Sequence, residues 1–172
     1  TPEGSEDLPF ALKQLLKGAG ARAVPVLDVE GVNADSRAIA TGEVFFALPG
    51  TRVHGDSCAA QAIGRGASAM VTDRTPDIDP GVPVVVVKDV RAAYARAASR
   101  QFAPQPRVAA AVTGTNGKSS IVSFVRQIWA ACGIKAASLG TVGIETNVGI
   151  RPQELTTSDP LLLHRDLAAL KA

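Results

Sequence analysis

The chain has 172 residues, of which 46% are hydrophobic and 20% charged, so a disordered or fibrous protein is excluded and one large or two small soluble domains are expected. The formal net charge is +2 and no basic run occurs, which argues against a nucleic-acid partner. Apolar runs, such as residues 82–87, are too short to cross a bilayer, which argues against a membrane-spanning segment.

The first seven residues are acidic and polar, unlike the start of a signal peptide, so a cytoplasmic protein is expected. Cys58 and Cys132 lack the spacing of metal ligands and lie among small or apolar residues, and both are predicted to be buried free thiols. His54 and His164 have no partner at ligand spacing, and no metal role is expected for either.

The first hundred residues alternate between helical and strand patterns. Apolar spacing predicts a short amphipathic helix in residues 8–17, and an apolar segment interrupted by Pro25 predicts an edge strand in residues 24–32. Further strands are predicted within residues 41–50, 67–72 and 82–88, with helices from about residue 57 to 64 and from 90 to 102. Asp56 or Ser57 is expected to cap the first of these two helices and Asp89 the second. The alternation predicts a small α/β domain.

Residues 103–107 read Ala-Pro-Gln-Pro-Arg, and two prolines in three residues break a helix and hold the chain extended. This segment is the predicted domain boundary. It separates an N-terminal domain over residues 1–103 from a second domain over residues 107–172.

The second domain is predicted to open on a phosphate-binding loop. Apolar residues 108–112 predict a buried strand, residues 114–119 read Gly-Thr-Asn-Gly-Lys-Ser, and a helix pattern follows. Gly114 and Gly117 lack a Cβ, so backbone N–H groups can approach a polyphosphate, and the helix N-terminus adds positive charge. Lys118 is expected to reach the β- and γ-phosphates and the Ser119 hydroxyl to contact Mg²⁺. The alternative is a strand-to-helix turn that happens to contain a lysine.

Beyond the loop, the pattern predicts a helix that stops at Gly133 and a second strand in residues 136–139, which together with residues 108–112 would form a parallel strand–helix–strand unit. The apolar face of this helix is predicted to be core, with base stacking by Trp129 as the weaker alternative. That face comprises Ile121, Val122, Val125, Ile128, Trp129 and Cys132. Asp159 as N-cap and Pro160 in the first turn predict a final helix over residues 160–171.

Five motifs stand in order along the chain: Asp-Ser-Arg at residues 35–37, a strand and turn at 42–50, the loop at 114–119, Leu-Gly-Thr-Val-Gly at 139–143 and Thr-Thr-Ser-Asp-Pro at 156–160. This combination resembles the Mur ligases of peptidoglycan synthesis. Within that family it is most similar to the members that add the third amino acid of the peptide. The resemblance runs from about residue 32 to the last residue.

The resemblance implies a small α/β domain that binds the UDP-sugar substrate, followed by the start of a P-loop, parallel-sheet ATPase domain. It implies ATP-dependent amide formation, in which the free carboxylate of UDP-N-acetylmuramoyl-L-Ala-D-Glu becomes an acyl phosphate and is attacked by the amine of an amino acid, with ATP and Mg²⁺ as cofactors. Positioning and charge neutralisation would do most of the catalytic work.

The site residues that the resemblance implies fall in three groups. Lys118 would be the catalytic residue on the phosphates and Ser119 the Mg²⁺ contact, within an ATP-binding set of Gly114, Thr115, Asn116, Gly117, Lys118, Ser119 and Ser120. Ser36, Thr51, Arg52 and Val53 would hold the UDP end, and Thr156 and Thr157 would contact the sugar-peptide. From the residues alone, an exposed turn with a local ion pair accounts for residues 35–37, and the start of a helix accounts for the two threonines.

Ser119 stands where the family usually has threonine, which keeps the hydroxyl. The family's ATPase domain continues further and its third, amino-acid-binding domain has no counterpart here, so the expectation is a monomeric fragment that cannot catalyse ligation by itself and does not reveal which amino acid is added. Alternatives are a UDP-sugar-binding module without catalysis and a related ligase such as folylpolyglutamate synthase. A phosphate-loop GTPase is weaker, because Val112 occupies the position of the first Walker A glycine.

Overall fold

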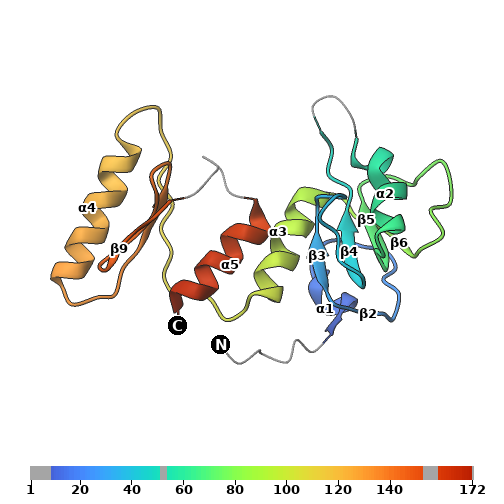
Figure 1. Ribbon diagram of the computed structural model, residues 1–172, viewed down its shortest axis with the longest axis horizontal. Coiled ribbons are helices and arrows are strands. Elements are labelled where there is room, and N and C mark those ends of the chain that lie inside the picture. Colours follow the sequence, from blue (N-terminus) through green and yellow to red (C-terminus); the bar gives the residue numbers. More distant parts are fainter. Residues whose placement is uncertain (1–8, 51–53, 153–158, 172) are drawn as a thin grey trace. The chain divides into compact units, whose positions relative to one another are not determined.

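The structure is a computed structural model that describes residues 9–50, 54–152 and 159–171. The chain divides between Pro104 and Gln105 into two compact units, unit 1 before the division and unit 2 after it (Figure 1). Within the described residues, no helix has the length and apolar character needed to span a membrane.

Unit 1 is built on a four-stranded parallel sheet with the strand order β3-β4-β5-β6. The strands are β3 (Gly31–Asn33), β4 (Glu43–Phe46), β5 (Ala69–Thr72) and β6 (Val84–Val86). The register pairs Phe45 with Met70 and Met70 with Val84, so apolar side chains of neighbouring strands share one face. The predicted α/β class with a parallel sheet is confirmed.

Different helices cover the two faces of this sheet. On one face lies α2 (Ala59–Gly64), whose Ala62 belongs to the same buried cluster as Phe45. On the other lies α3 (Val90–Gln101), whose Tyr94 ring is centred 5.2 Å from the ring of Phe46. Because successive strand residues point to opposite faces, Phe45 and Phe46 hold the helices on opposite sides of the strands, as Figure 1 shows.

Sequence reasoning located one helix start in unit 1 correctly and another wrongly. The predicted cap of α3 is confirmed, because Asp89 Oδ1 accepts the N–H of Ala92 at 2.9 Å. In front of α2, however, a 3₁₀ turn (η1, Gly55–Cys58) begins the helical segment, and its cap is His54, whose Nδ1 accepts the N–H of Asp56 at 3.2 Å. The expectation that Asp56 or Ser57 would be the cap is therefore wrong.

The N-terminal elements are shorter than predicted. A strand, β1 (Phe10–Ala11), precedes a four-residue helix, α1 (Leu12–Leu15), and pairs antiparallel with β2 (Asp28–Val29). The single strand predicted over residues 24–32 is instead divided between β2 and β3. The division falls at Glu30, because β2 pairs with β1 whereas β3 pairs with β4.

Unit 2 places a long helix beside an antiparallel three-stranded sheet. The elements are α4 (Lys118–Ala131), β7 (Ser138–Gly140), β8 (Gly143–Thr146), β9 (Gly149–Arg151) and α5 (Pro160–Lys171). Arg126 of α4 donates from Nη2 to Glu145 Oε1 of β8 at 2.6 Å, which ties the helix to the sheet. The predicted start of α5 is confirmed, because Asp159 Oδ1 accepts the N–H of Leu161 at 2.8 Å.

The strand predicted for residues 108–112 is absent from the described structure, and Val108 is 69% exposed. A parallel strand needs a neighbour for its backbone N–H and C=O groups, and β7, the partner that sequence reasoning assigned, pairs antiparallel with β8. The predicted parallel strand–helix–strand unit is therefore wrong for the described residues.

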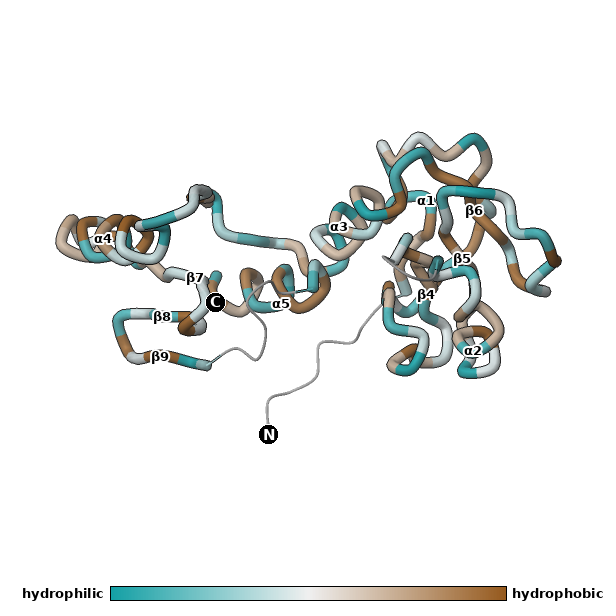
Figure 2. The backbone as a smooth tube through the Cα atoms, turned by 90° about the horizontal axis from the view of Figure 1, so that it is seen from above, coloured by the Kyte–Doolittle hydropathy of each residue, from teal (hydrophilic) through white to brown (hydrophobic). Residues whose placement is uncertain are grey.

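The apolar face of α4 is more exposed than predicted. Ile121 is 49%, Phe124 61% and Ile128 60% exposed, and Figure 2 shows hydrophobic and hydrophilic residues alternating along this helix. Trp129 is half-buried, whereas Cys132 is exposed. A buried face is therefore the wrong expectation for Ile121, Ile128 and Cys132.

The expected burial of the thiols is also wrong, because the free cysteines Cys58 and Cys132 are both exposed.

Candidate nucleotide and substrate sites

The loop predicted to bind phosphate is open and leads directly into α4. Gly117 is the N-cap of α4 with φ of +76°, in the left-handed region that favours glycine, and Gly114 has φ of +149°. A Cβ added at Gly117 would meet no heavy atom within 4 Å, so this part of the loop is free of neighbouring groups. No acidic residue lies in the first turn of α4, which leaves the positive end of the helix dipole uncompensated.

The side chain of Lys118 folds back over this loop. Its Nζ donates to the carbonyl oxygen of Gly114 and, at 3.3 Å, to that of Thr115. A protonated amine is thereby held within reach of the loop's own backbone, in the position where a phosphate oxygen could replace the two carbonyls as its partner. The residues at this position fit a polyphosphate.

Ser119 and Ser120 follow in the first turn of α4, and both are exposed. The described residues contain no group of three or more His, Cys, Asp or Glu side chains that could hold a metal ion. A Mg²⁺ at the Ser119 hydroxyl would therefore take most of its remaining ligands from phosphates and water, which suits the reluctance of this ion to lose its hydration shell.

In the Asp-Ser-Arg turn the three residues play different parts. Asp35 and Arg37 form an exposed ion pair with Arg37 Nη2 2.9 Å from Asp35 Oδ2, and hydrogen bonds from Arg37 lower the pKa of the Asp35 carboxyl. Ser36 is only 7% exposed, and its hydroxyl donates to Gln61 Oε1 of α2 at 2.6 Å. The local ion pair weighed as the alternative thus exists, whereas Ser36 joins the turn to α2.

Several candidate substrate residues lie outside the described residues. They are Thr51, Arg52 and Val53 in the segment after β4, and Thr156 and Thr157 in the segment before α5. On either side of the first segment, Pro49 and His54 form an isolated antiparallel bridge, and the N–H of Gly55 donates to the carbonyl of Leu48 at 2.9 Å.

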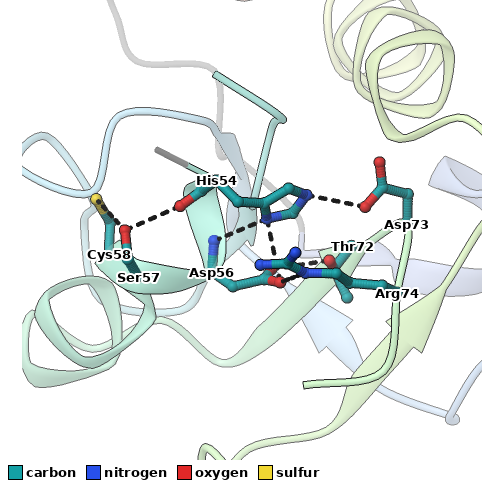
Figure 3. A network of polar contacts seen from close by, with 7 residues as sticks. All are labelled: His54, Asp56, Ser57, Cys58, Thr72, Asp73 and Arg74. Carbon is teal, nitrogen blue, oxygen red and sulfur yellow. Dashed lines mark hydrogen bonds and ion pairs between the residues drawn. The ribbon is translucent and has the colours of Figure 1, made fainter. Parts of the chain in front are cut away.

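Next to that segment is a polar network that sequence reasoning missed (Figure 3). The imidazole of His54 lies between two carboxylates, with Nε2 2.9 Å from Asp73 Oδ1 and Nδ1 3.1 Å from Asp56 Oδ2. Asp56 also accepts from Thr72 Oγ1 at 2.8 Å and from Arg74 Nε at 2.6 Å. The network joins η1 to the end of β5, and the separation of 19 residues between His54 and Asp73 left no local signal in the sequence.

Comparison with known families and proteins now identifies the two halves of the chain. Residues 28–113 match the model described as "Mur ligase family, catalytic domain", and residues 112–172 match the "Mur ligase middle domain". Curated relatives named UDP-N-acetylmuramoyl-L-alanyl-D-glutamate--2,6-diaminopimelate ligase include that of Mesorhizobium japonicum, 46% identical over 84% of this chain, and that of Rhizobium meliloti, 41% identical over 92%. The chain spans about a third of the length of these relatives, 30% and 32%.

Solved structures share the fold. A structure described as a UDP-N-acetylmuramoyl-L-alanyl-D-glutamate--2,6-diaminopimelate ligase superposes with a TM-score of 0.76 and 24% identity, over 95% of this chain and 34% of that one. The MurF ligase of Thermotoga maritima in complex with ADP superposes with a TM-score of 0.51 and 21% identity, over 79% and 29%. With family models matching residues 28–172, the chain belongs to the Mur ligase family.

Proposed function

We propose that the protein to which this chain belongs forms an amide bond, at the expense of ATP, between UDP-N-acetylmuramoyl-L-Ala-D-Glu and the amine of a third amino acid in peptidoglycan synthesis. The observation that carries the proposal is the open loop at residues 114–119, with the Lys118 ammonium folded over it at the N-terminus of α4. The names of the curated relatives favour 2,6-diaminopimelate as the amino acid.

Unit 2 supplies the groups that would hold ATP. The backbone N–H groups of the loop and the N-terminus of α4 would bind the phosphates, Lys118 would neutralise their charge, and Ser119 would contribute a hydroxyl to Mg²⁺. When bound, ATP supplies a phosphoryl group that converts a carboxylate, a poor acyl donor, into a good one. The chain's own part in that chemistry is to position and neutralise charge.

Unit 1 would bind the nucleotide sugar. Ser36, and Thr51, Arg52 and Val53 further along, follow β3 and β4, and the carboxyl ends of parallel strands are where α/β sheets bind ligands. Thr156 and Thr157 would contact the sugar-peptide from unit 2. Because the Ser36 hydroxyl already donates its hydrogen to Gln61, it can contact a substrate mainly as a hydrogen-bond acceptor.

The test is a ligase assay on the full-length protein with ATP, Mg²⁺, UDP-N-acetylmuramoyl-L-Ala-D-Glu and a panel of amino acids that includes meso-2,6-diaminopimelate, lysine and glycine. We expect phosphate release and a UDP-tripeptide with the first of these. Turnover with a folate substrate and glutamate instead would favour the folylpolyglutamate synthase alternative. The absence of a product with every amino acid would overturn the proposal. The 172-residue chain assayed alone is expected to give no product.

A second function, a nucleotide-sugar-binding module, is favoured by one observation. Among the described residues, every buried hydrophobic side chain except Ile144 lies in unit 1, so unit 1 has a core of its own. Calorimetric titration of the 172-residue chain with UDP, with and without ATP, distinguishes the two functions. Binding of UDP with no binding of ATP would support the module, whereas binding of both supports the ligase.

A further inference from the structure

A cavity of about 620 Å³ opens in unit 1 beside the carboxyl ends of β4, β5 and β6. Its wall includes Gly18, Pro49, Asp73, Lys88, Arg91 and Arg96, and we refer to it as the α3 cavity. Pro49, Asp73 and Lys88 follow the three strands in turn, and because the strands are parallel these residues meet at one edge of the sheet. The volume is within the range of small-ligand sites, and the location is where open α/β sheets bind ligands.

Three cationic side chains converge on the α3 cavity. Arg91 donates from Nη2 to the carbonyl of Pro49, and Arg96 donates from Nη1 to the carbonyl of Gly18 at 3.0 Å. A carbonyl is neutral, and a guanidinium has five N–H groups, so these bonds orient both side chains without compensating their charge. Lys88 is exposed and makes no hydrogen bond or ion pair within residues 9–50, 54–152 and 159–171.

Two carboxylates share the wall, and each is engaged elsewhere. Asp73 Oδ1 lies 2.9 Å from His54 Nε2, and Asp89 Oδ1 accepts the N–H of Ala92 as the cap of α3. The three cations of the wall against its two carboxylates leave the cavity with one positive charge in excess.

We propose that the α3 cavity binds a phosphate group of a small ligand. The two oriented guanidinium groups provide forked donors suited to phosphate oxygens, and Lys88 provides a mobile ammonium at the rim. Either a free polyphosphate or the diphosphate of a nucleotide could supply this chemistry. The α3 cavity is distinct from the loop at residues 114–119, which belongs to unit 2, and from Ser36, which is bonded to α2 on the other face of the sheet from α3. For a nucleotide diphosphate the inference rests on the proposed function, whereas the pyrophosphate titration tests the cavity by itself.

The experiment is a titration of the ¹⁵N-labelled 172-residue chain with inorganic pyrophosphate, followed by amide chemical shifts. Because pyrophosphate also fits the loop of unit 2, the titration is made on a Lys118→Ala background, and only the shifts of residues 18–20 and 88–92 are scored. Lys88→Glu is the test variant. Lys13→Glu is the matched control, since Lys13 is an exposed lysine of unit 1 outside the cavity wall.

We expect saturable shifts at residues 18–20 and 88–92, a dissociation constant raised at least about tenfold by Lys88→Glu, and little change with Lys13→Glu. The absence of saturable shifts at residues 18–20 and 88–92, or equal affinity in Lys88→Glu and the control, would overturn the proposal. Titrations with UDP and with uridine show which kind of ligand supplies the phosphate group. Tighter binding of UDP than of pyrophosphate assigns the cavity to a nucleotide diphosphate, and equal binding assigns it to a free polyphosphate. Chemical-shift changes at these residues with uridine but not with pyrophosphate would contradict the proposal.

Discussion

The hydroxyl of Ser36 lies 2.6 Å from Oε1 of Gln61, so the turn after β3 is tied to α2 by one short hydrogen bond. Ser36 is 7% exposed, whereas Gln61 is exposed. Replacing Ser36 by a bulky residue would therefore disturb the packing against α2 as well as a substrate contact, and such a variant cannot separate the two effects.

Ser36→Ala is the cleaner change. We expect it to lower the free energy of unfolding by about 1 kcal/mol, because Gln61 loses its donor but can be hydrated in exchange. Urea denaturation, monitored by the hydrogen exchange of the backbone amides of α2 and α3, measures this loss. Ser119→Ala, which changes an exposed serine of unit 2, is the control. If Ser36 contacts the nucleotide sugar, UDP binding will fall further than the stability loss accounts for. Unchanged stability would contradict the role of the Gln61 bond.

Gly55 is predicted to be intolerant of any side chain. An added Cβ would lie 2.7 Å from the carbonyl carbon of Ala47 and 2.7 Å from the backbone nitrogen of Leu48, so the backbone itself would have to move. We expect Gly55→Ala to destabilise unit 1 by roughly 1–3 kcal/mol, the range of overpacked sites. Gly64→Ala is the matched control: nothing lies within 4 Å of its Cβ, and in a helix alanine is favoured over glycine by up to about 1 kcal/mol. Equal thermal shifts for the two variants would refute this reading.

Structural features whose interacting groups lie close together in the sequence were predicted correctly. Asp89 caps α3 and Asp159 caps α5 because each carboxylate bonds an N–H two or three residues ahead, and that geometry is encoded in consecutive residues. The alternation of strands and helices in unit 1 likewise followed from apolar patterns within each segment.

Structural features that depend on residues far apart in the sequence could not be predicted. The apolar run at residues 108–112 has strand composition, but a parallel strand also requires a neighbour, and β7 pairs with β8 instead. His54 caps η1 because Asp73 and Asp56 orient its ring, and Asp73 is 19 residues away. For the candidate site, the residue types at Gly114, Gly117 and Lys118 were readable, whereas the back-folded Lys118 and the buried Ser36 were not.

Unit 2 is expected to lose stability in mild acid through His164. Burial lowers the pKa of this imidazole, which lies on α5 with Nδ1 2.8 Å from Gln105 Nε2. The unfolded chain therefore binds a proton more readily than the folded chain. The stabilising contribution is fully present above the unfolded pKa, about 6.5, and is lost as the pH falls through the lower folded value.

His164→Gln should flatten this pH dependence. Trp129 is the only tryptophan of the chain and lies in unit 2, so its fluorescence reports the unfolding of this unit. We expect the free energy of unfolding to fall more between pH 7.5 and pH 5 in the unsubstituted chain than in the variant. Identical pH slopes would mean that the protonation of His164 is not linked to folding.

The loop of unit 2 makes the sharpest prediction about ligand binding. Lys118→Met keeps the length of the side chain and removes the charge, so the loss of a charge-assisted contact should weaken ATP binding at least about tenfold. The fold should be little affected, because Lys118 is exposed and its bonds to the carbonyls of Gly114 and Thr115 can be replaced by water. Lys135→Met, an exposed lysine of the same unit, is the matched control.

Calorimetric titration with ATP and Mg²⁺ provides the measurement, on the full-length protein and on the 172-residue chain. Gly117→Ala gives an independent check: at φ of +76° an alanine is strained by about 1–2 kcal/mol, and its Cβ would stand in a loop that is otherwise open. If both substitutions leave ATP affinity unchanged while the Tm of each variant stays within a few degrees of the original, the nucleotide binds elsewhere, and the loop is only a turn before α4 that contains a lysine.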